Sequence, residues 1–415
     1  MSTPEGFGAG GPFDSGPLGE LMRNLARFFT SQGPLNWEIA RQMAHWAASE
    51  GQPEANPDPV SRVRLEELIR VAEMHVSEAT GLTVAPGGVL TVAAVTPSGW
   101  ALRTLEHWKP LLEQLATRMI PPAAGPGGAG AANPFGGALP GGAEAGPGED
   151  PMARLFGSLP QVLGPFLLGL QSGSMVGQLA TGAMGQFDLP MPRPAGGELM
   201  LVPATIDRFA SDWSLAPDDV RMWICLRETT NLAVLGRAHV RSRLEQLISD
   251  YVQAFSPTSR PLEERMEGID ITDMAGLQAA FGDPASLVEE MQNDAQRRIQ
   301  VPLRALLSAV VGYVDYVMDG VGRRLIGSYG PLTEALRRQR LEETPGAKIL
   351  GQMFGVALGA EHYEQGQAFV HGVLERAGTD GLAKLWRSER DLPTPAEVAA
   401  PGLWLARLEL DDPDR

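Results

Sequence analysis

Hydrophobic side chains recur every three to four residues along most of this chain, which is the period of an amphipathic helix. One clear example runs from Val60 to Thr80. Asn36 precedes another such segment and is a residue type that caps helix N-termini. The same spacing predicts helices over residues 19–30, 37–49, 100–120, 217–235, 238–255, 332–342, 347–358, 361–377 and 381–387, and one that begins at Pro302. The pattern therefore predicts a mainly α fold.

Two short segments depart from the helical period. Residues 89–95, VLTVAAV, are rich in β-branched side chains and form the better strand candidate. Residues 198–203 form the second candidate. We therefore expect a small β-sheet beside the helices.

Two stretches of the chain have a composition that cannot bury a core. Residues 1–20 predict a disordered tail. Residues 121–150 consist mostly of Gly, Pro and Ala and predict a disordered insertion. The remainder divides into an N-terminal helical part with a short strand, residues 21–120, and a helical domain, residues 151–411. Composition leaves open whether the insertion separates two domains or loops out of one.

Residues 155–187 contain no charged side chain, so they could be mistaken for a membrane span. Pro160 and Pro165 interrupt the segment, and Gly, Ser and Gln dilute it below the continuous apolar run of about 20 residues that a span requires. We expect buried helices that pack closely through Gly and Ala.

The charge and cysteine content exclude several classes of function. The 415 residues carry a formal net charge of −16 at pH 7, and an acidic surface repels both phosphate backbones and anionic lipids. We therefore expect neither nucleic acid nor a membrane as partner. The one cysteine, Cys225, excludes an intramolecular disulfide and a thiolate zinc cluster. The first residues lack the basic and apolar regions of a secretory signal, which favours a cytoplasmic location.

Six segments carry the most specific sequence features of the chain. They are GPLNWEIARQMA (33–44), VGQLATGAMGQFDLPMP (176–192), WICLRETTNLAVLGRAHVRSRLEQLISDYV (223–252), GYVDYVMDGVG (312–322), YEQGQAFVHGVLERAG (363–378) and LPTPAEVAAPGLWLAR (392–407). In this order they resemble the zincin-like (type 2) metallopeptidases of bacteria. The resemblance spans nearly the whole chain outside the tail and the insertion, and it implies a zincin-like helical core with a small sheet.

The resemblance also implies a zinc site on the helix that begins WICL. The family normally carries H-E-x-x-H there, because residues four apart share one helical face and direct two imidazoles at one metal. The Glu of that motif serves as general base, and a third ligand, a Glu, is expected directly before the Gly of the GYVDYVMD segment. Such a site holds zinc with three protein ligands and leaves one position for water.

This sequence departs from the family pattern at all three ligand positions. Arg227 stands at the first His, Asn231 at the second and Val311 at the third ligand, while Glu228 keeps the position of the general base. A guanidinium stays protonated and repels a cation, an amide oxygen is a weak ligand, and a valine offers none. We therefore expect no zinc cofactor, and we interpret Glu228 as a vestigial general base that now acts as a counter-ion.

Arg227 lies on the apolar stripe of its predicted helix, so its charge should have a partner. Asp315, one turn beyond Val311 on the facing helix, is the best candidate, ahead of Asp319 and Glu228. On this hypothesis the guanidinium replaces the metal as the cation that joins the two helices. The other interpretation is that Arg227 extends to solvent at the edge of a cleft.

The histidines offer no replacement zinc site by spacing. They are His45, His75, His107, His239, His362 and His371, and no two have the spacing of a helical ligand pair. His239 is nearest in sequence to the former site, but two further ligands would still be missing. Cys225 has no evident His partner and falls inside a helix that should be buried.

These observations lead to three hypotheses on function. The first is a family member without the zinc ligands that does not hydrolyse peptides and acts by binding an unknown protein or peptide. The second is a working zinc-dependent hydrolase that uses Glu228 and a non-standard metal site. The third is a structural subunit that depends on a partner, and the oligomeric state stays open.

Overall fold

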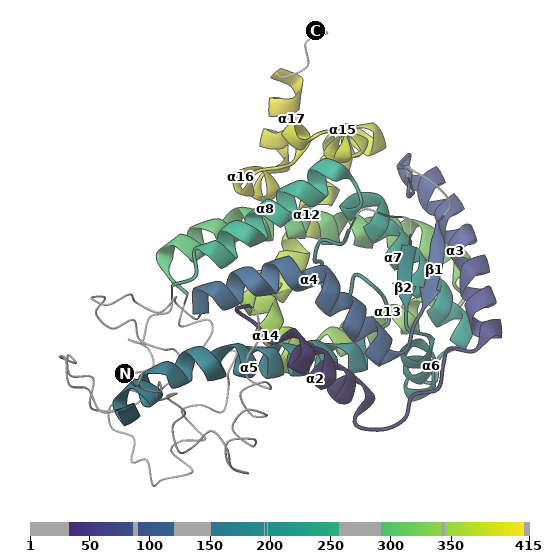
Figure 1. Cartoon of the computed structure of the whole chain (residues 1–415). Helices are drawn as coiled ribbons and strands as arrows, with labels where there is room; N and C mark the ends of the chain where they lie inside the picture. Colours follow the sequence, from purple (N-terminus) through teal and green to yellow (C-terminus); the bar gives the residue numbers. More distant parts are fainter. Residues whose placement is uncertain are drawn as a thin grey trace, which may run out of the picture.

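The computed structural model describes residues 33–85, 90–119, 151–194, 196, 198–256, 292–341 and 345–410 (Figure 1). The predicted tail at residues 1–20, the insertion at 121–150 and the helix at 19–30 lie outside the described residues. The fold is mainly α with a small sheet, as the hydrophobic pattern predicted.

The first elements confirm the helical pattern closely. Helix α2 spans Trp37–Ser49, and the side chain of Asn36 accepts a hydrogen bond from the amide of Ile39, as expected of an N-cap. Helices α3 and α4 span Pro59–Thr80 and Pro97–Met119.

The sheet consists of two short parallel strands. Strands β1 (Thr91–Ala94) and β2 (Glu198–Leu201) come from the two segments that were predicted as strands. Gly185, which lies between α5 and β2, forms an isolated antiparallel bridge with Leu201. The bridge holds the segment around Gly185 against β2.

The uncharged stretch forms one long helix rather than several. Helix α5 spans Pro151–Gly182 and continues through both prolines that were expected to interrupt it. It packs against α2 (Figure 1), and the two backbones approach most closely at Gly169, Gly173 and Gly177. This outcome confirms the expected close packing through glycine.

The C-terminal half places α7 and α12 at the centre of the helical core. Helix α12 packs against α7, α8 and α15. The helices of this half are α6 (Pro203–Asp212), α7 (Pro217–Leu235), α8 (Ala238–Gln253), α12 (Asp294–Leu325), α13 (Tyr329–Leu341), α14 (Pro345–Met353), α15 (Ala360–Ala383), α16 (Pro395–Ala399) and α17 (Pro401–Leu410), with short 3₁₀ turns at Lys384–Trp386 and Glu389–Asp391.

Some predicted helix boundaries in this half are wrong. Helix α12 begins at Asp294 rather than Pro302, because Asn293 and Gln296 form a reciprocal capping box ahead of the proline. Helix α14 ends at Met353 rather than at residue 358. The break predicted between the helices at 361–377 and 381–387 is confirmed by a kink within α15, where Gly378 has a non-helical backbone with φ of 62°.

Helix α12 is long and apolar enough to cross a membrane by length and composition alone, but 67% of that apolar window is buried inside the fold. It crosses α15 where Gly312 meets Gly366, and a Cβ on either glycine would lie within 3.0 Å of the other helix. We therefore interpret α12 as a core helix.

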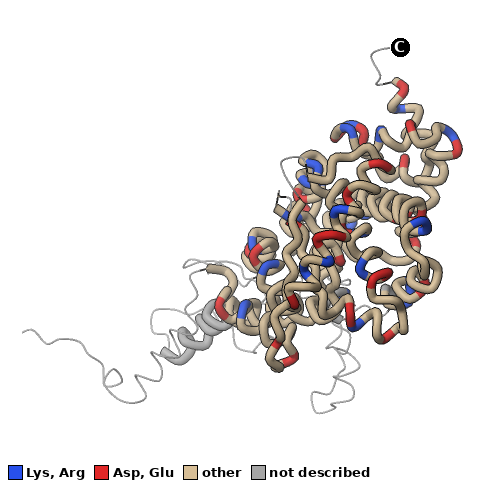
Figure 2. The backbone as a smooth tube through the Cα atoms, turned by 90° about the vertical axis from the view of Figure 1, so that its right-hand side faces the viewer, with Lys and Arg blue, Asp and Glu red and all other residues tan. Residues whose placement is uncertain are grey.

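Charged residues of both signs are interspersed along the described chain (Figure 2). Few of them are buried. Among the described residues, the buried charged side chains are Arg193, Glu228 and Glu397. Glu228 lies on α7, where the sequence predicted a site, and Arg193 lies on the loop after α5, so this region combines charge with burial.

Candidate functional site

Glu228 lies in the middle of α7 and is fully buried. Its Oε2 accepts a hydrogen bond of 2.8 Å from the amide of Phe187, while its Oε1 has no hydrogen-bond partner. Gly185 lies directly against the carboxylate, since a Cβ at that position would come within 3.0 Å of the Glu228 side chain. The loop from residue 183 to 188 therefore fits closely around this carboxylate.

Arg227 is the cation of the site. Its Nη1 lies 2.7 Å from Oδ1 of Asp188 and 3.9 Å from Oε1 of Glu228. Its guanidinium also lies over the ring of Trp223, at 5.8 Å from the ring centroid. The side chains of Arg227 and Asp188 are each 17% exposed, so the ion pair is largely desolvated. Such a pair requires accurate geometry to offset the cost of desolvation.

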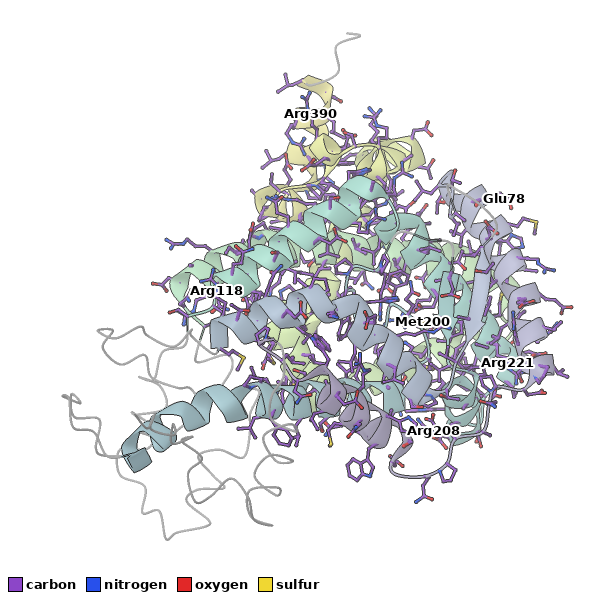
Figure 3. The ribbon with its side chains drawn as sticks, in the orientation of Figure 1. Glu78, Arg118, Met200, Arg208, Arg221 and Arg390 are labelled. Carbon is purple, nitrogen blue, oxygen red and sulfur yellow. The ribbon has the colours of Figure 1, made fainter. Side chains whose placement is uncertain are left out.

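Asp188 also fixes the loop that carries it. Its Oδ2 accepts hydrogen bonds from the amides of Met184 and Gly185, at 2.6 and 3.0 Å. One carboxylate thus holds the turn together and neutralises Arg227 at the same time. The end of this loop reaches the sheet, where Gln186 accepts a hydrogen bond from the amide of Met200, the buried residue labelled near the centre of Figure 3.

Arg227 pairs with a carboxylate that the sequence did not suggest. We predicted Asp315 on α12, ahead of Asp319 and Glu228; the guanidinium bonds Asp188, on the loop between α5 and β2, and Glu228 lies 3.9 Å from it. Asp319, a weaker candidate, instead bonds Arg323 and Tyr329. Helical spacing can suggest an ion-pair partner on a neighbouring helix. It cannot suggest a partner on a loop, because the position of the loop over α7 depends on the tertiary fold. Asp188 is the first charged residue after the uncharged stretch, which was the available signal.

The residues at the expected ligand positions do not fit a zinc ion. The guanidinium of Arg227 is engaged by Asp188, and the side-chain amide of Asn231 donates to the carbonyl of Arg227 at 2.9 Å. Val311 is half-buried on α12, which packs against α7, and its side chain is a hydrocarbon. Within the described residues, no three His, Cys, Asp or Glu side chains converge in a way that could hold a metal.

A second buried arginine, which the sequence analysis did not find, lies close by. Arg193 lies between the rings of Trp100 and Trp108, at 5.6 and 5.2 Å from their centroids. Its guanidinium donates to the Thr104 hydroxyl at 3.2 Å and to the Gln186 carbonyl at 2.9 Å. Burial lowers its pKa to about 10, although the charges of Glu228 and Asp188 act in the opposite direction. No local motif signals this residue, because its neighbours come from α4.

The side chains of His107 and Cys225 are not suited to acid–base or nucleophilic chemistry at neutral pH. Burial, together with Arg193 and Arg103, lowers the pKa of His107 to about 4, so its imidazole is neutral at pH 7. Cys225 is fully buried, and burial raises the pKa of its thiol far above neutrality. A protonated buried thiol is a poor nucleophile, which agrees with the expectation from sequence.

Burial raises the pKa of Glu228 from an ordinary 4.5 to about 7, although Arg227 acts in the opposite direction. The folded protein therefore binds a proton at Glu228 more tightly than the unfolded chain does. This contribution to stability is fully present below pH 4.5 and is lost as the pH rises through 7.

We expect Glu228→Gln to remove this pH dependence. Between pH 5 and pH 8, the free energy of unfolding of the unchanged protein should fall relative to that of the variant by roughly 3 kcal/mol, at about 1.36 kcal/mol per unit of pKa. Urea unfolding at a series of pH values measures the difference, and the titration of His107 cancels because both proteins contain it. Parallel stability profiles would show that Glu228 does not titrate in this range.

The family profile described as zincin-like metallopeptidase matches residues 35–405. The chain belongs to this family. No curated protein matches the zincin-like chain. Family membership describes the fold of the chain. Its function has to be argued from the residues of the site.

The fold of this zincin-like chain is similar to a solved structure. The structure is the "putative hydrolase with a novel fold" from Chloroflexus aurantiacus, with a TM-score of 0.57 and 21% sequence identity. The match covers 90% of this chain and 99% of the other. At this level of identity the comparison shows that the two share a fold.

Proposed function

We propose that this chain is a zincin-like family member that does not hydrolyse peptides and that acts by binding a protein or peptide. The observation that carries the proposal is the ion pair between Arg227 and Asp188, with Glu228 at its edge. By the resemblance, this pair occupies the place where the family holds its metal. A buried guanidinium there supplies a fixed positive charge, but it has no exchangeable position for water.

The surroundings of Glu228 support the same proposal. A general base must reach the proton that it abstracts, within a hydrogen bond or through one water. Glu228 is fully buried, and its two oxygens face the Phe187 amide and Gly185. The carboxylate thus acts as a counter-ion for Arg227 and as an anchor for the loop. We further propose a cytoplasmic location, because the single cysteine allows no intramolecular disulfide, and partners other than nucleic acid and membranes, because of the net charge of −16.

One observation favours the alternative, a zinc-dependent hydrolase with a non-standard metal site. A carboxyl with a pKa of about 7 has the proton affinity of a general base that works at neutral pH. The alternative also needs three ligands, at least some of them outside the positions 227, 231 and 311. It therefore predicts bound zinc in the purified protein, which our proposal does not.

Zinc content and peptide cleavage test the proposal. We expect purified protein to contain far less than one zinc per chain and to leave a mixture of unstructured peptides intact. The triple variant R227H/N231H/V311E should take up close to one zinc, because three ligands then converge. The double variant R227H/N231H is the matched control and should bind zinc more weakly. Stoichiometric zinc in the unchanged protein, with cleavage that Glu228→Gln abolishes, would support the hydrolase instead.

A further inference from the structure

Helix α3 carries apolar side chains on two different faces. The inner face packs on α7, α12 and β1. Its buried residues are Leu65, Leu68, Ile69, Ala72 and Val76. On the outer face, Val60, Val63 and Met74 are 73%, 55% and 58% exposed. Nine large hydrophobic side chains are exposed among the described residues, and these three share one helix, so the outer face is a patch rather than scattered exposure.

The outer face of α3 has the spacing of a coiled-coil seam. Its positions alternate by three and four residues along most of the helix, as the a and d positions of a heptad repeat do. In order they are Val60, Val63, Glu67, Arg70, Met74 and Ser77. This spacing is typical of a helix that pairs with one other helix along its length.

A second helix can reach this seam from outside the molecule. Figure 1 shows α3 at the right-hand edge, and Figure 3 labels Glu78, near the C-terminal end of α3, at the same edge. Beside the seam, Arg62 lies 2.9 Å from Glu66 and Arg64 lies 3.1 Å from Asp218. These flanking charges are paired within the chain, so the seam itself is open to a partner.

The two central positions of the seam carry opposite charges. Glu67 and Arg70 are both exposed. Oε2 of Glu67 lies 3.4 Å from Arg64, whereas among the described residues no carboxylate oxygen lies within 4.0 Å of the Arg70 guanidinium. Charged groups inside a seam lower its stability, and their use in coiled coils is to specify the partner and its orientation.

We propose that α3 pairs with α3 of a second copy of this chain, in an antiparallel dimer with two-fold symmetry. With the centre of the contact between positions 68 and 69, each Val63 faces Met74 of the second copy. Each Glu67 likewise faces Arg70 of the second copy, and the symmetry repeats every contact. A parallel pair would place Glu67 against Glu67 and Arg70 against Arg70, so like charges disfavour it.

The charge of α3 also permits contact between two acidic chains. Residues 59–80 contain three arginines and four glutamates, so α3 is nearly neutral although the whole chain carries a net charge of −16. Salt further screens charges that lie more than about 8 Å apart at physiological ionic strength. Two copies therefore repel each other less at α3 than their net charges suggest.

Sedimentation equilibrium of the full chain, from about 1 to 200 µM, tests the proposal. We expect a dimer with a Kd on the order of 10 µM. Arg70→Glu should weaken the dimer at least about tenfold, because each Glu67 then faces a second carboxylate. Arg62→Glu is the matched control, since it changes the net charge equally at an exposed position of α3 outside the seam, and it should leave the Kd unchanged.

A mixture of two variants separates charge pairing from damage to the fold. Glu67→Arg alone should also weaken the dimer. Mixing the Glu67→Arg and Arg70→Glu proteins should restore a dimer, because one chain then presents two bases and the other two acids along the seam. Two unfolded chains could not produce this recovery.

Disulfide formation tests the orientation of the two helices. Val60→Cys combined with Ser77→Cys should link two copies under mild oxidation, because the two positions face each other in the antiparallel arrangement. Ser77→Cys alone should not, since the two copies of position 77 then lie about 25 Å apart along the pair. The native Cys225 is buried and does not interfere.

Four results would overturn the proposal. They are a monomer up to about 200 µM, a dimer that Arg70→Glu weakens no more than Arg62→Glu does, a variant mixture that stays monomeric, and efficient linkage by Ser77→Cys alone.

Discussion

Replacing Gly173 with alanine is expected to lower the free energy of unfolding by about 3 kcal/mol or more. Gly173 lies where α5 crosses α2, and a Cβ there would come within 3.0 Å of the Ala40 carbonyl group and Cα. These atoms belong to a backbone, so no side-chain rotation can relieve the clash. Overpacking a well-packed interior already costs about 1–3 kcal/mol when side chains can adjust. The two helices would have to separate along their whole contact.

Gly182, at the end of the same helix, supplies the matched control. A Cβ at Gly182 meets nothing within 4 Å. Alanine is favoured over glycine in a helix by about 0.5–1 kcal/mol, so Gly182→Ala should be neutral or slightly stabilising. Urea unfolding of both variants gives the comparison. Similar free energies of unfolding for both would mean that α2 and α5 do not pack backbone to backbone at Gly173.

Arg227→Met is expected to lower the free energy of unfolding by about 3–5 kcal/mol at pH 7, which is typical when one partner of a buried ion pair is removed. The variant leaves Asp188 without its cation, although the Asp188 carboxylate keeps its bonds to the amides of Met184 and Gly185. It also removes the positive charge that lies 3.9 Å from Oε1 of Glu228. Methionine keeps most of the apolar volume of the side chain, so the loss reports mainly on charge.

A surface pair of the same residue types is the control for this prediction. Arg64 lies 3.1 Å from Asp218, with side chains 44% and 58% exposed, and Arg64→Met should change the free energy of unfolding little, because solvent screens an exposed ion pair. Adding Asp188→Asn to Arg227→Met should recover part of the loss, since no carboxylate at position 188 is then left unpaired. If Arg227→Met were as mild as Arg64→Met, Arg227 would not be the cation that holds this loop to α7.

Much of the fold could be predicted because the apolar spacing and the capping residues of each helix are visible in its own sequence. Helix α2 and its cap were predicted from Asn36 and the apolar spacing. The start of α12 was missed although the signal was present, since Asn293 and Gln296 have the spacing of a capping box. The continuity of α5 was missed because local rules treat Pro160 and Pro165 as breaks, whereas packing along the glycine face favours one helix.

The candidate site was predicted in part. Arg227, Glu228 and Asn231 lie within five residues of one helix, so their common location follows from the sequence. Asp188 is separated from Arg227 by 39 positions, and the sequence analysis did not find it. Arg193 was missed for the same reason, since the tryptophans on either side of it belong to α4.

By itself, the sequence determined the helical class, the short strands and the residue types at positions 227, 231 and 311, because periodicity and side-chain chemistry are local properties. The tertiary structure alone decided which carboxylate neutralises Arg227 and placed Arg193 where, among the described residues, no carboxylate pairs with it. Burial and contact depend on how the loop after α5 folds back over α7, where Asp188 meets Arg227 and Phe187 meets Glu228. These contacts join segments that are distant in sequence, so local patterns along the chain cannot predict them.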